Sequence, residues 1–483
     1  MKLHDPALLK DRGFIDGEWV DSIGGARLEV VDPASGESIG TVPDMGPDET
    51  RIAVSAASST WNPWRNLVAK ERAAVLRKWF DLILAHQEDL ACLITAEQGK
   101  PQAEALNEIL YGASFVEWFA EEAKRTYGDV IPTYKPDRRI IAIKQPIGVV
   151  AAITPWNFPV AMITRKVAPA LAAGCTVVIK PAEETPLSAL ALAELAHRAG
   201  FPKGVLNVLT GQPQPIGQAL MRHPGVRKVS FTGSTEVGKL LLSQSAETVK
   251  KLSLELGGNA PFIVFDDADI DSAVHGAIAS KYRNAGQTCI CANWLLVQDD
   301  IYEAFAQRLT DAVSSLRVGP GNQADTDIGP LINEAAVRRM EALLADAQAQ
   351  GAAVRAGGKR HARGGYYFEP TVLTGAKPAM RVVREEIFGP IAPMCSFATE
   401  EDAIQSANAG SYGLAAYAYT RDYARVWRLM ERLEYGIVGI NEGLVSTETA
   451  PFGGMKQSGI GREGSKYGID EFLEVKYVCL GGL

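Results

Sequence analysis

Apolar residues recur at different spacings along the chain, and each spacing predicts a different kind of element. Residues 14–42 alternate short apolar runs with turn signals such as Asp16-Gly17, which is typical of edge strands or hairpins. Residues 47–126 carry apolar positions at helical spacing, so we expect several core-facing helices there. From residue 147 onward, apolar runs alternate with turns and helical segments. That alternation predicts βαβ units and a parallel sheet.

The predicted parallel-sheet region has two parts. The first contains strands at 148–153, 176–180, 206–210 and 229–232 and helices at 163–173 and 186–199. The second extends from about 261 to 444 and includes a predicted strand at 262–265 and a predicted helix at 334–350. Before both, residues 129–145 have a β-type pattern between regions of different character. We interpret this segment as a strand that leaves its domain.

Composition limits the class of protein. A chain of 483 residues, 47% hydrophobic and 22% charged, is long enough for two or three domains with large cores. A net charge of -8 disfavours a nucleic-acid or membrane-surface role, because those partners usually require a basic field. The six cysteines are too few for a disulfide framework, and the first residues resemble no signal or transit peptide. A reducing, cytoplasmic location is therefore expected.

Cys289 is the strongest candidate for a reactive group. It follows Gly286-Gln287-Thr288, a polar and glycine-containing loop rather than an apolar run. Reactive cysteines are partly exposed near backbone donors, whereas structural ones lie in apolar surroundings. A loop cysteine without chemistry is the alternative. None of the six histidines has metal-ligand spacing or a distinctive setting, so no metal site is indicated and a base would be a carboxylate.

Two further side chains suit chemistry at such a cysteine. Glu255 lies among leucines and precedes Gly257-Gly258, so burial would raise its pKa toward the range of a general base. A solvated glutamate at a strand end is an equal alternative. Asn157 lies between Pro155 and Pro159, and an amide held in this way is a good oxyanion donor, although asparagine is common in turns.

A phosphate site is suggested where residues 232–238 follow a strand and begin a helix, because a helix N-terminus offers backbone N–H groups. The glycine spacing is not the usual dinucleotide fingerprint, and a helix N-cap by Ser234 or Thr235 is the simpler explanation. Lys180 and Glu183 lie at the carboxyl end of another predicted parallel strand, where open α/β sheets bind ligands. A ribose diol would find a cation and an acceptor there.

Taken together, six motifs resemble the aldehyde dehydrogenase superfamily, in order and along almost the whole chain: Pro155-Trp156-Asn157-Phe158-Pro159, Lys180-Pro181-Ala182-Glu183, Phe231-Thr232-Gly233-Ser234, Leu254-Glu255-Leu256-Gly257-Gly258, Gly286-Gln287-Thr288-Cys289 and Glu386-Ile387-Phe388-Gly389-Pro390. The resemblance implies an α/β fold with a Rossmann-like cofactor domain (1–126 and 146–257), a catalytic α/β domain (258–450) and a β oligomerisation arm (127–145 and 465–483). In relatives the arm pairs with another subunit, so a homodimer or homotetramer is expected.

The same resemblance implies the roles of the site residues. Cys289 would attack an aldehyde to give a thiohemiacetal and then a thioester, with the oxyanion held by Asn157 and the Cys289 backbone N–H. Glu255 would activate the water that hydrolyses the thioester. The residues implied to bind the cofactor are Trp156, Lys180, Glu183, Gly233, Ser234, Leu256, Glu386 and Phe388.

Within the superfamily the chain most resembles the branch that oxidises succinate semialdehyde to succinate, through residues 163–166, 282–291 and the tail from 451 to 483. Arg165, Arg283 and Ser446 would then receive a distal carboxylate, although either arginine could instead form an internal salt bridge. Glu183 would repel a 2′-phosphate, so NAD is expected to be preferred over NADP. Cys291 resembles a redox partner of some relatives, where a disulfide with the nucleophile would block the site.

Three alternatives to this activity remain at the level of sequence. The same chemistry could act on glutarate semialdehyde, which is one methylene longer and which a pocket discriminates by only ~1–3 kcal/mol. A non-catalytic structural or binding protein on the same scaffold is a second alternative. A cofactor-free thiol hydrolase is the third, and it would turn over thioesters or esters without a nicotinamide cofactor.

Overall fold

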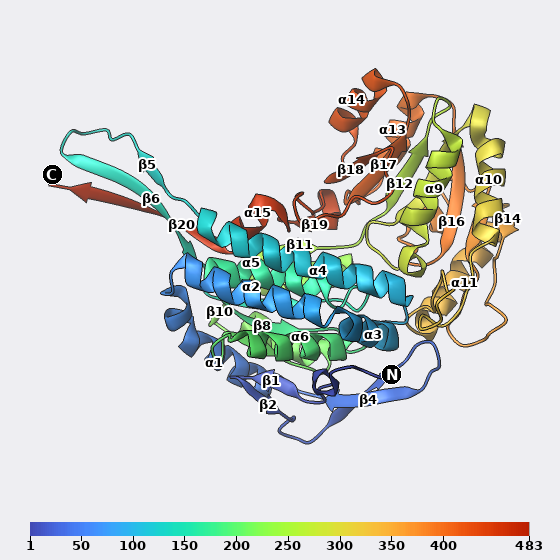
Figure 1. The fold of residues 1–483 in the computed structure, drawn as a ribbon. Helices are drawn as coiled ribbons and strands as arrows, with labels where there is room; N and C mark the ends of the chain where they lie inside the picture. The colour runs from blue at the N-terminus through green and yellow to red at the C-terminus, as the bar shows by residue number, and fades with distance from the viewer. Residues whose placement is uncertain (483) are drawn as a thin grey trace.

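The computed structural model describes residues 1–482 and has two α/β lobes with a projecting β arm (Figure 1). The first lobe is built on an eight-stranded sheet in which β7, β8, β9, β10 and β11 are parallel. The strand order is β19 (Gly459–Ile460), β11 (Lys251–Glu255), β10 (Val226–Thr232), β7 (Val149–Ile153), β8 (Thr176–Lys180), β9 (Leu206–Val208), β1 (Gly13–Ile15) and β2 (Glu18–Val20). The predicted βαβ arrangement is therefore confirmed.

Helices cover both faces of this sheet, because its central strands are apolar on both sides. Val149 and Ala151 of β7 face one core, and Val150 and Ala152 face the other. The first core also involves α1 (Pro47–Arg65), α7 (Pro213–Arg222) and α8 (Thr235–Ser245). The second involves α5 (Ala161–Ala173), α6 (Pro186–Ala199), α2 (Ala69–Ala85), α3 (Gln87–Gln98) and α4 (Gln102–Glu122).

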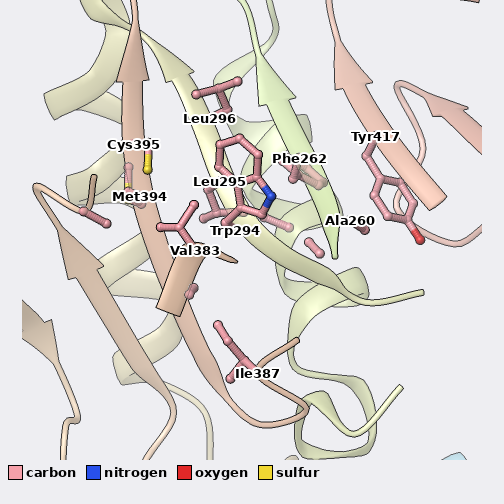
Figure 2. Packing of buried hydrophobic residues seen from close by; sticks show 14 of the residues in the cluster. Ala260, Phe262, Trp294, Leu295, Leu296, Val383, Ile387, Met394, Cys395 and Tyr417 are labelled. Carbon is pink, nitrogen blue, oxygen red and sulfur yellow. The ribbon is translucent and has the colours of Figure 1, made fainter. Parts of the chain in front are cut away.

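The second lobe has a seven-stranded sheet in which only the edge strand β14 is antiparallel. The order is β14 (Ala353–Ala356), β15 (Thr371–Thr374), β16 (Ile391–Phe397), β13 (Ala292–Gln298), β12 (Ala260–Val264), β17 (Ala415–Tyr419) and β18 (Ile437–Ile440). Figure 2 shows Phe262, Trp294 and Met394 in the core that these strands share. The helices of this lobe are α9 (Ile270–Lys281), α10 (Tyr302–Ser314), α11 (Glu334–Ala349), α12 (Arg381–Arg384), α13 (Glu400–Asn408) and α14 (Tyr423–Arg432).

The arm is a three-stranded antiparallel sheet that extends away from both lobes (Figure 1). It consists of β5 (Asp129–Ile131), β6 (Arg138–Pro146) and β20 (Leu473–Gly481), with β20 paired to β6 along its whole length. The strand predicted to leave its domain is thus β5 and β6. The predicted C-terminal arm segment begins with a helix, α15 (Ser465–Asp470), which packs on α4 and α5 rather than in the arm. Residue 483 lies outside the described residues.

The remaining elements are short. A hairpin of β3 (Arg27–Val31) and β4 (Ser38–Pro43) confirms the turn-rich pattern predicted near the N-terminus. Short 3-10 turns lie at Pro6–Leu8, Ala123–Arg125, Arg283–Gly286, Asp299–Ile301 and Lys456–Ser458. Among the described residues, no helix combines the length and apolar character needed to span a bilayer.

Candidate active site

Four parallel strands of the first lobe end next to one another, and the candidate residues follow them. Thr232 of β10 pairs with Glu255 of the neighbouring strand β11, and Ile153 of β7 pairs with Lys180 of the neighbouring strand β8. The loop after β7 carries Asn157. Ligands of open α/β sheets bind at the carboxyl ends of the strands, so this edge is where a dinucleotide is expected.

Cys289 reaches the same place from the second lobe on a tightly constrained loop. Asn284 and Ala285 have φ of 51° and 54°, a left-handed conformation that is unfavourable for residues other than glycine. Gly286 follows at φ 75°, and a Cβ there would collide with the carbonyl oxygen of Gly389. Gly258 is equally restricted, because its Cβ would collide with the backbone oxygen of Cys289. The loop therefore holds the thiol in one position between the lobes.

A cavity of about 240 Å³ collects most of the predicted catalytic and cofactor residues. Its lining contains Pro155, Trp156, Asn157, Met162, Thr232, Gly233, Ser234, Leu256, Gly257, Cys289, Glu386 and Phe388. Trp156 and Phe388 meet edge to face with ring centroids 5.5 Å apart. We call this space the thiol cavity. It joins a nucleophile, an amide donor and an apolar wall.

The surroundings of Cys289 keep its thiol protonated and leave two donors beside it. Burial raises the pKa of the thiol to about 12, and Arg165 only partly opposes that rise. The backbone N–H of Cys289 makes no hydrogen bond to another residue in the range 1–482. Asn157 Nδ2 donates to Gln287 O at 3.0 Å and keeps a second hydrogen, since an amide nitrogen carries two. An oxyanion formed at Cys289 could use both donors.

Glu255 is buried, but its carboxylate turns away from the thiol cavity. The residues after it, Leu256 and Gly257, line the cavity, whereas its Oε1 atom lies beside Gly453. Burial and the nearby Glu463 carboxylate raise the pKa of Glu255 well above its usual value. Its Oε2 atom has no hydrogen-bond partner among the residues described. A buried carboxyl group with a raised pKa and a free oxygen has the properties of a general base.

The thiol cavity has features that fit a nicotinamide dinucleotide. Ser234 is the N-cap of α8 and accepts a hydrogen bond from Val237 N at 3.3 Å, whereas the N–H groups of Thr235 and Glu236 have no acceptor among the described residues and could meet a phosphate. Glu386 Oε1 accepts a hydrogen bond from Gly258 N at 3.0 Å, and burial raises its pKa to about 7. Lys180 and Glu183 form an ion pair of 2.9 Å at the end of β8, outside the cavity lining. The residues present therefore suit a nicotinamide dinucleotide.

A second cavity, of about 250 Å³, is lined by Phe158, the residue that follows Asn157. Its lining contains Lys100, Glu104, Asn107, Glu108, Tyr111, Phe158, Arg283, Leu444 and Ser446. Arg283 has no carboxylate within ion-pair distance among the described residues, and its buried Nε atom has no hydrogen-bond partner there. We call this space the arginine cavity. A guanidinium that lacks an internal partner is available to an anionic ligand.

Arg165 differs from Arg283, although the sequence suggested the same role for both. It is fully buried outside the arginine cavity, in ion-pair contact with Glu463 and over the ring of Phe452 at 4.1 Å. Lys166 binds the same Glu463 carboxylate. The internal salt bridge considered from sequence is thus present for Arg165, while Arg283 and Ser446 face one cavity.

Cys291 is a free, buried thiol that donates to Gly286 O at 3.3 Å. The exposure that would favour its oxidation is absent in this conformation. Its proposed disulfide with Cys289 stays a prediction. Within residues 1–482 no cluster of three His, Cys, Asp or Glu side chains could hold a metal ion.

Sequence reasoning missed a buried network that holds the Asn157 loop. Lys100 Nζ donates to Asn157 O and to Glu108 Oε2, both at 2.7 Å. Glu108 Oε1 accepts hydrogen bonds from Val160 N and Ala161 N at the start of α5. A lysine between Gly99 and Pro101 was the only local signal, and Glu108 reads as an ordinary helix position. Neither indicates a partner more than 50 residues away.

Comparisons with known proteins agree with this geometry. The profile described as the aldehyde dehydrogenase family matches residues 19–478. An Escherichia coli (strain K12) protein named succinate-semialdehyde dehydrogenase [NADP(+)] is 60% identical over 100% of both chains, and a Pseudomonas aeruginosa glutarate-semialdehyde dehydrogenase is 59% identical over 100% of both. A crystal structure described as an E. coli NADP-dependent enzyme superposes with a TM-score of 0.99 at 59% identity, covering 99% of this chain and 100% of that one.

The preference for NAD over NADP that was predicted from Glu183 is wrong. The E. coli relative is named for NADP, and so is the solved structure. The physical argument treated Glu183 as a free carboxylate, but its charge is balanced by Lys180 Nζ at 2.9 Å. Repulsion of a 2′-phosphate by a paired carboxylate is weak.

Proposed function

Because the chain belongs to the aldehyde dehydrogenase family, we propose that it oxidises an aldehyde bearing a distal carboxylate, with succinate semialdehyde as the leading substrate. The observation that carries this proposal is Arg283, which lies six residues before Cys289 in the sequence. It lines the arginine cavity and has no internal carboxylate partner among the described residues. Its planar fork suits a carboxylate. The names of relatives at 60% and 59% identity support both succinate and glutarate semialdehyde as substrates.

The reaction begins with Cys289. The thiol loses its proton to a base and adds to the aldehyde carbon, forming a thiohemiacetal whose oxyanion accepts hydrogen bonds from Asn157 Nδ2 and the Cys289 N–H. The thiohemiacetal carbon must then lose a hydride to become a thioester, and a nicotinamide dinucleotide, when bound, would supply the acceptor for that hydride. We infer that Trp156, Gly233, Ser234, Leu256, Glu386 and Phe388 hold it, with Lys180 and Glu183 near its ribose.

Glu255 then serves the second half of the reaction. Its carboxylate takes a proton from water, the water oxygen adds to the thioester carbon, and the sulfur of Cys289 leaves and regains a proton. The Glu255 side chain must turn from Gly453 toward Cys289 for this step. Arg283 and Ser446 hold the distal carboxylate throughout.

The decisive experiment compares a carboxylated aldehyde with a neutral one. We expect Arg283→Ala to lower kcat/KM for succinate semialdehyde by about 100-fold while leaving butanal nearly unchanged, because a hydrogen-bonded charge pair is lost for only one substrate. Arg308→Ala, which removes an arginine on the surface of α10, is the matched control. Equal selectivity in Arg283→Ala and the parent enzyme contradicts the proposal.

Glutarate semialdehyde and both cofactors belong in the same assay. One methylene changes selectivity by a factor of about 10–200, so the ratio of kcat/KM values identifies the preferred chain length. Each aldehyde is measured with NAD and with NADP at equal concentrations. Ester or thioester turnover that needs no cofactor, without any rise in reduced-nicotinamide absorbance, supports the hydrolase alternative instead.

A further inference from the structure

Tyr111 has a buried hydroxyl group with no hydrogen-bond partner among the described residues. It lies on α4 and lines the arginine cavity together with Arg283 and Ser446. Its ring meets Phe115 edge to face with centroids 4.9 Å apart, so the ring is held by the core of the first lobe. A buried donor without an acceptor is unfavourable, and such groups usually have a ligand or water as partner.

The electrostatics around Tyr111 keep it a donor. Burial raises the pKa of its hydroxyl group, while the neighbouring Arg165 and Ser446 act in the opposite direction. The hydroxyl therefore stays protonated near neutral pH, and the guanidinium of Arg165 beside it has no lone pair to offer. The hydroxyl oxygen of Ser446 lies nearby but makes no hydrogen bond to Tyr111, so a carboxylate that enters the cavity would be a stronger acceptor for the Tyr111 proton.

The charges in the arginine cavity leave room for one anion. Lys100 is already neutralised by Glu108 at 2.7 Å. Glu104 accepts a hydrogen bond from Asn284 N at 2.8 Å, and burial raises the pKa of its carboxyl group, which favours the neutral form of this residue. Arg283 is then the cation without a close carboxylate. Two neutral hydroxyl groups, from Tyr111 and Ser446, line the same space.

We propose that Tyr111 is a specificity-determining residue that donates a hydrogen bond to the distal carboxylate of the substrate, beside Arg283 and Ser446. This inference rests on the proposed function, since it concerns the same end of the substrate. Arg283 supplies the charge, and the two hydroxyl groups fix where the carboxylate sits. The distance of Tyr111 from Cys289 then helps to set the length of aldehyde that reaches the thiol.

The substitution Tyr111→Phe tests this role, because it removes the hydroxyl group and keeps the ring against Phe115. We expect kcat/KM for succinate semialdehyde to fall about tenfold or more, mainly through a higher KM, as for a lost hydrogen bond to a charged group. For butanal the value should change less than twofold. The inhibition constant of succinate, a probe that carries the carboxylate without the aldehyde, should rise by a similar factor.

A purely structural role gives a different result. If Tyr111→Phe lowers kcat/KM equally for succinate semialdehyde and butanal, or for neither, the proposal is overturned. Tyr302→Phe is the matched control, because it also removes a tyrosine hydroxyl group, one that donates to Met394 O away from both cavities. Circular dichroism verifies that each variant is folded.

Failure of this inference can be separated from failure of the proposed function. If the parent enzyme does not prefer succinate semialdehyde to butanal, the proposed substrate class is wrong. If the parent enzyme is selective and Arg283→Ala abolishes the selectivity, but Tyr111→Phe retains it, the substrate class stands and only the role of Tyr111 is rejected.

Discussion

Single residues show how the same kind of side chain acquires different chemistry here. Arg165 and Arg283 read alike in sequence, yet Arg165 contacts Glu463 and Arg283 has no carboxylate within ion-pair distance in the described chain. The sequence predicted Cys289, Asn157 and the cofactor wall through local motifs, and the structure brings these residues to one cavity. Tyr111 could not be predicted, because its significance lies in an unmet hydrogen bond that only the folded cavity reveals.

The raised pKa of Glu255 gives a prediction about pH. Below that pKa the group is a neutral carboxyl, so base catalysis should increase as pH rises through it. We expect Glu255→Gln to lose this limb of the kcat profile, to lower kcat by about 10²–10⁴-fold and to accumulate the thioester. Stopped-flow kinetics with acid-quench mass spectrometry measures both effects.

The same shift has a consequence for stability that serves as a check. A carboxyl whose pKa is raised by folding keeps its proton while the unfolded chain releases one, so the free energy of unfolding falls as pH rises between the two pKa values. At pH 8, Glu255→Gln should therefore not be less stable in urea than the parent enzyme. Glu97→Gln is the matched control: burial raises the pKa of Glu97 to about 8, but this residue binds the N-terminus of α6 outside both cavities. If the pH-dependent limb of the kcat profile disappears in Glu97→Gln and persists in Glu255→Gln, Glu255 is not the general base.

At the scale of elements, the periodicities identified buried strands and long helices but not their charged ends. β7 and β8 were predictable because parallel strands covered on both faces are continuously apolar. β10 begins at Val226, three residues earlier than predicted. The prediction missed these residues because Arg227 and Lys228 interrupt the apolar run of the strand. Lys228 is nevertheless buried and bound to Ser253 Oγ, a contact between strands that the local sequence does not contain.

The link between α4 and α5 gives a prediction at this scale. Lys100 and Glu108 hold the loop that carries Asn157, so Lys100→Met should displace the oxyanion donor. Because misplacement by about 1 Å can cost about 100-fold in rate, we expect kcat to fall tenfold or more with little change in the KM of the cofactor. Removing one partner of such a buried pair also costs about 3–5 kcal/mol of stability.

Lys228→Met is the control for that loss of stability. It removes another fully buried lysine of the first lobe, one that contacts Ser253 and Glu471 rather than the Asn157 loop. Kinetics at a temperature where both variants are folded by circular dichroism should show the fall in kcat for Lys100→Met alone. Equal kcat values would show that the network stabilises the fold without positioning the amide.

At the scale of the whole molecule, the arm buries too few apolar side chains to be stable as an isolated sheet. Its strands expose large apolar side chains, including Val130 at 85%, Val475 at 70% and Tyr477 at 60%. A three-stranded sheet of this size is marginal alone, and an exposed apolar patch on an open sheet edge usually marks an association surface. The domain division and the oligomeric state remain predictions, but the arm is the element that most requires a partner.

The double variant Val475→Asp/Tyr477→Asp tests this need. Both side chains lie on one face of β20, since alternate residues of a strand point the same way. If a second subunit covers that face, two buried charges oppose association, and light scattering after gel filtration should give a mass near 51.9 kDa, that of one chain. Ile23→Asp, at a residue 66% exposed outside the arm, should leave the mass of the parent protein unchanged. A parent protein that already has the mass of one chain, or a double variant that keeps the larger mass, shows that this face is not covered by another subunit.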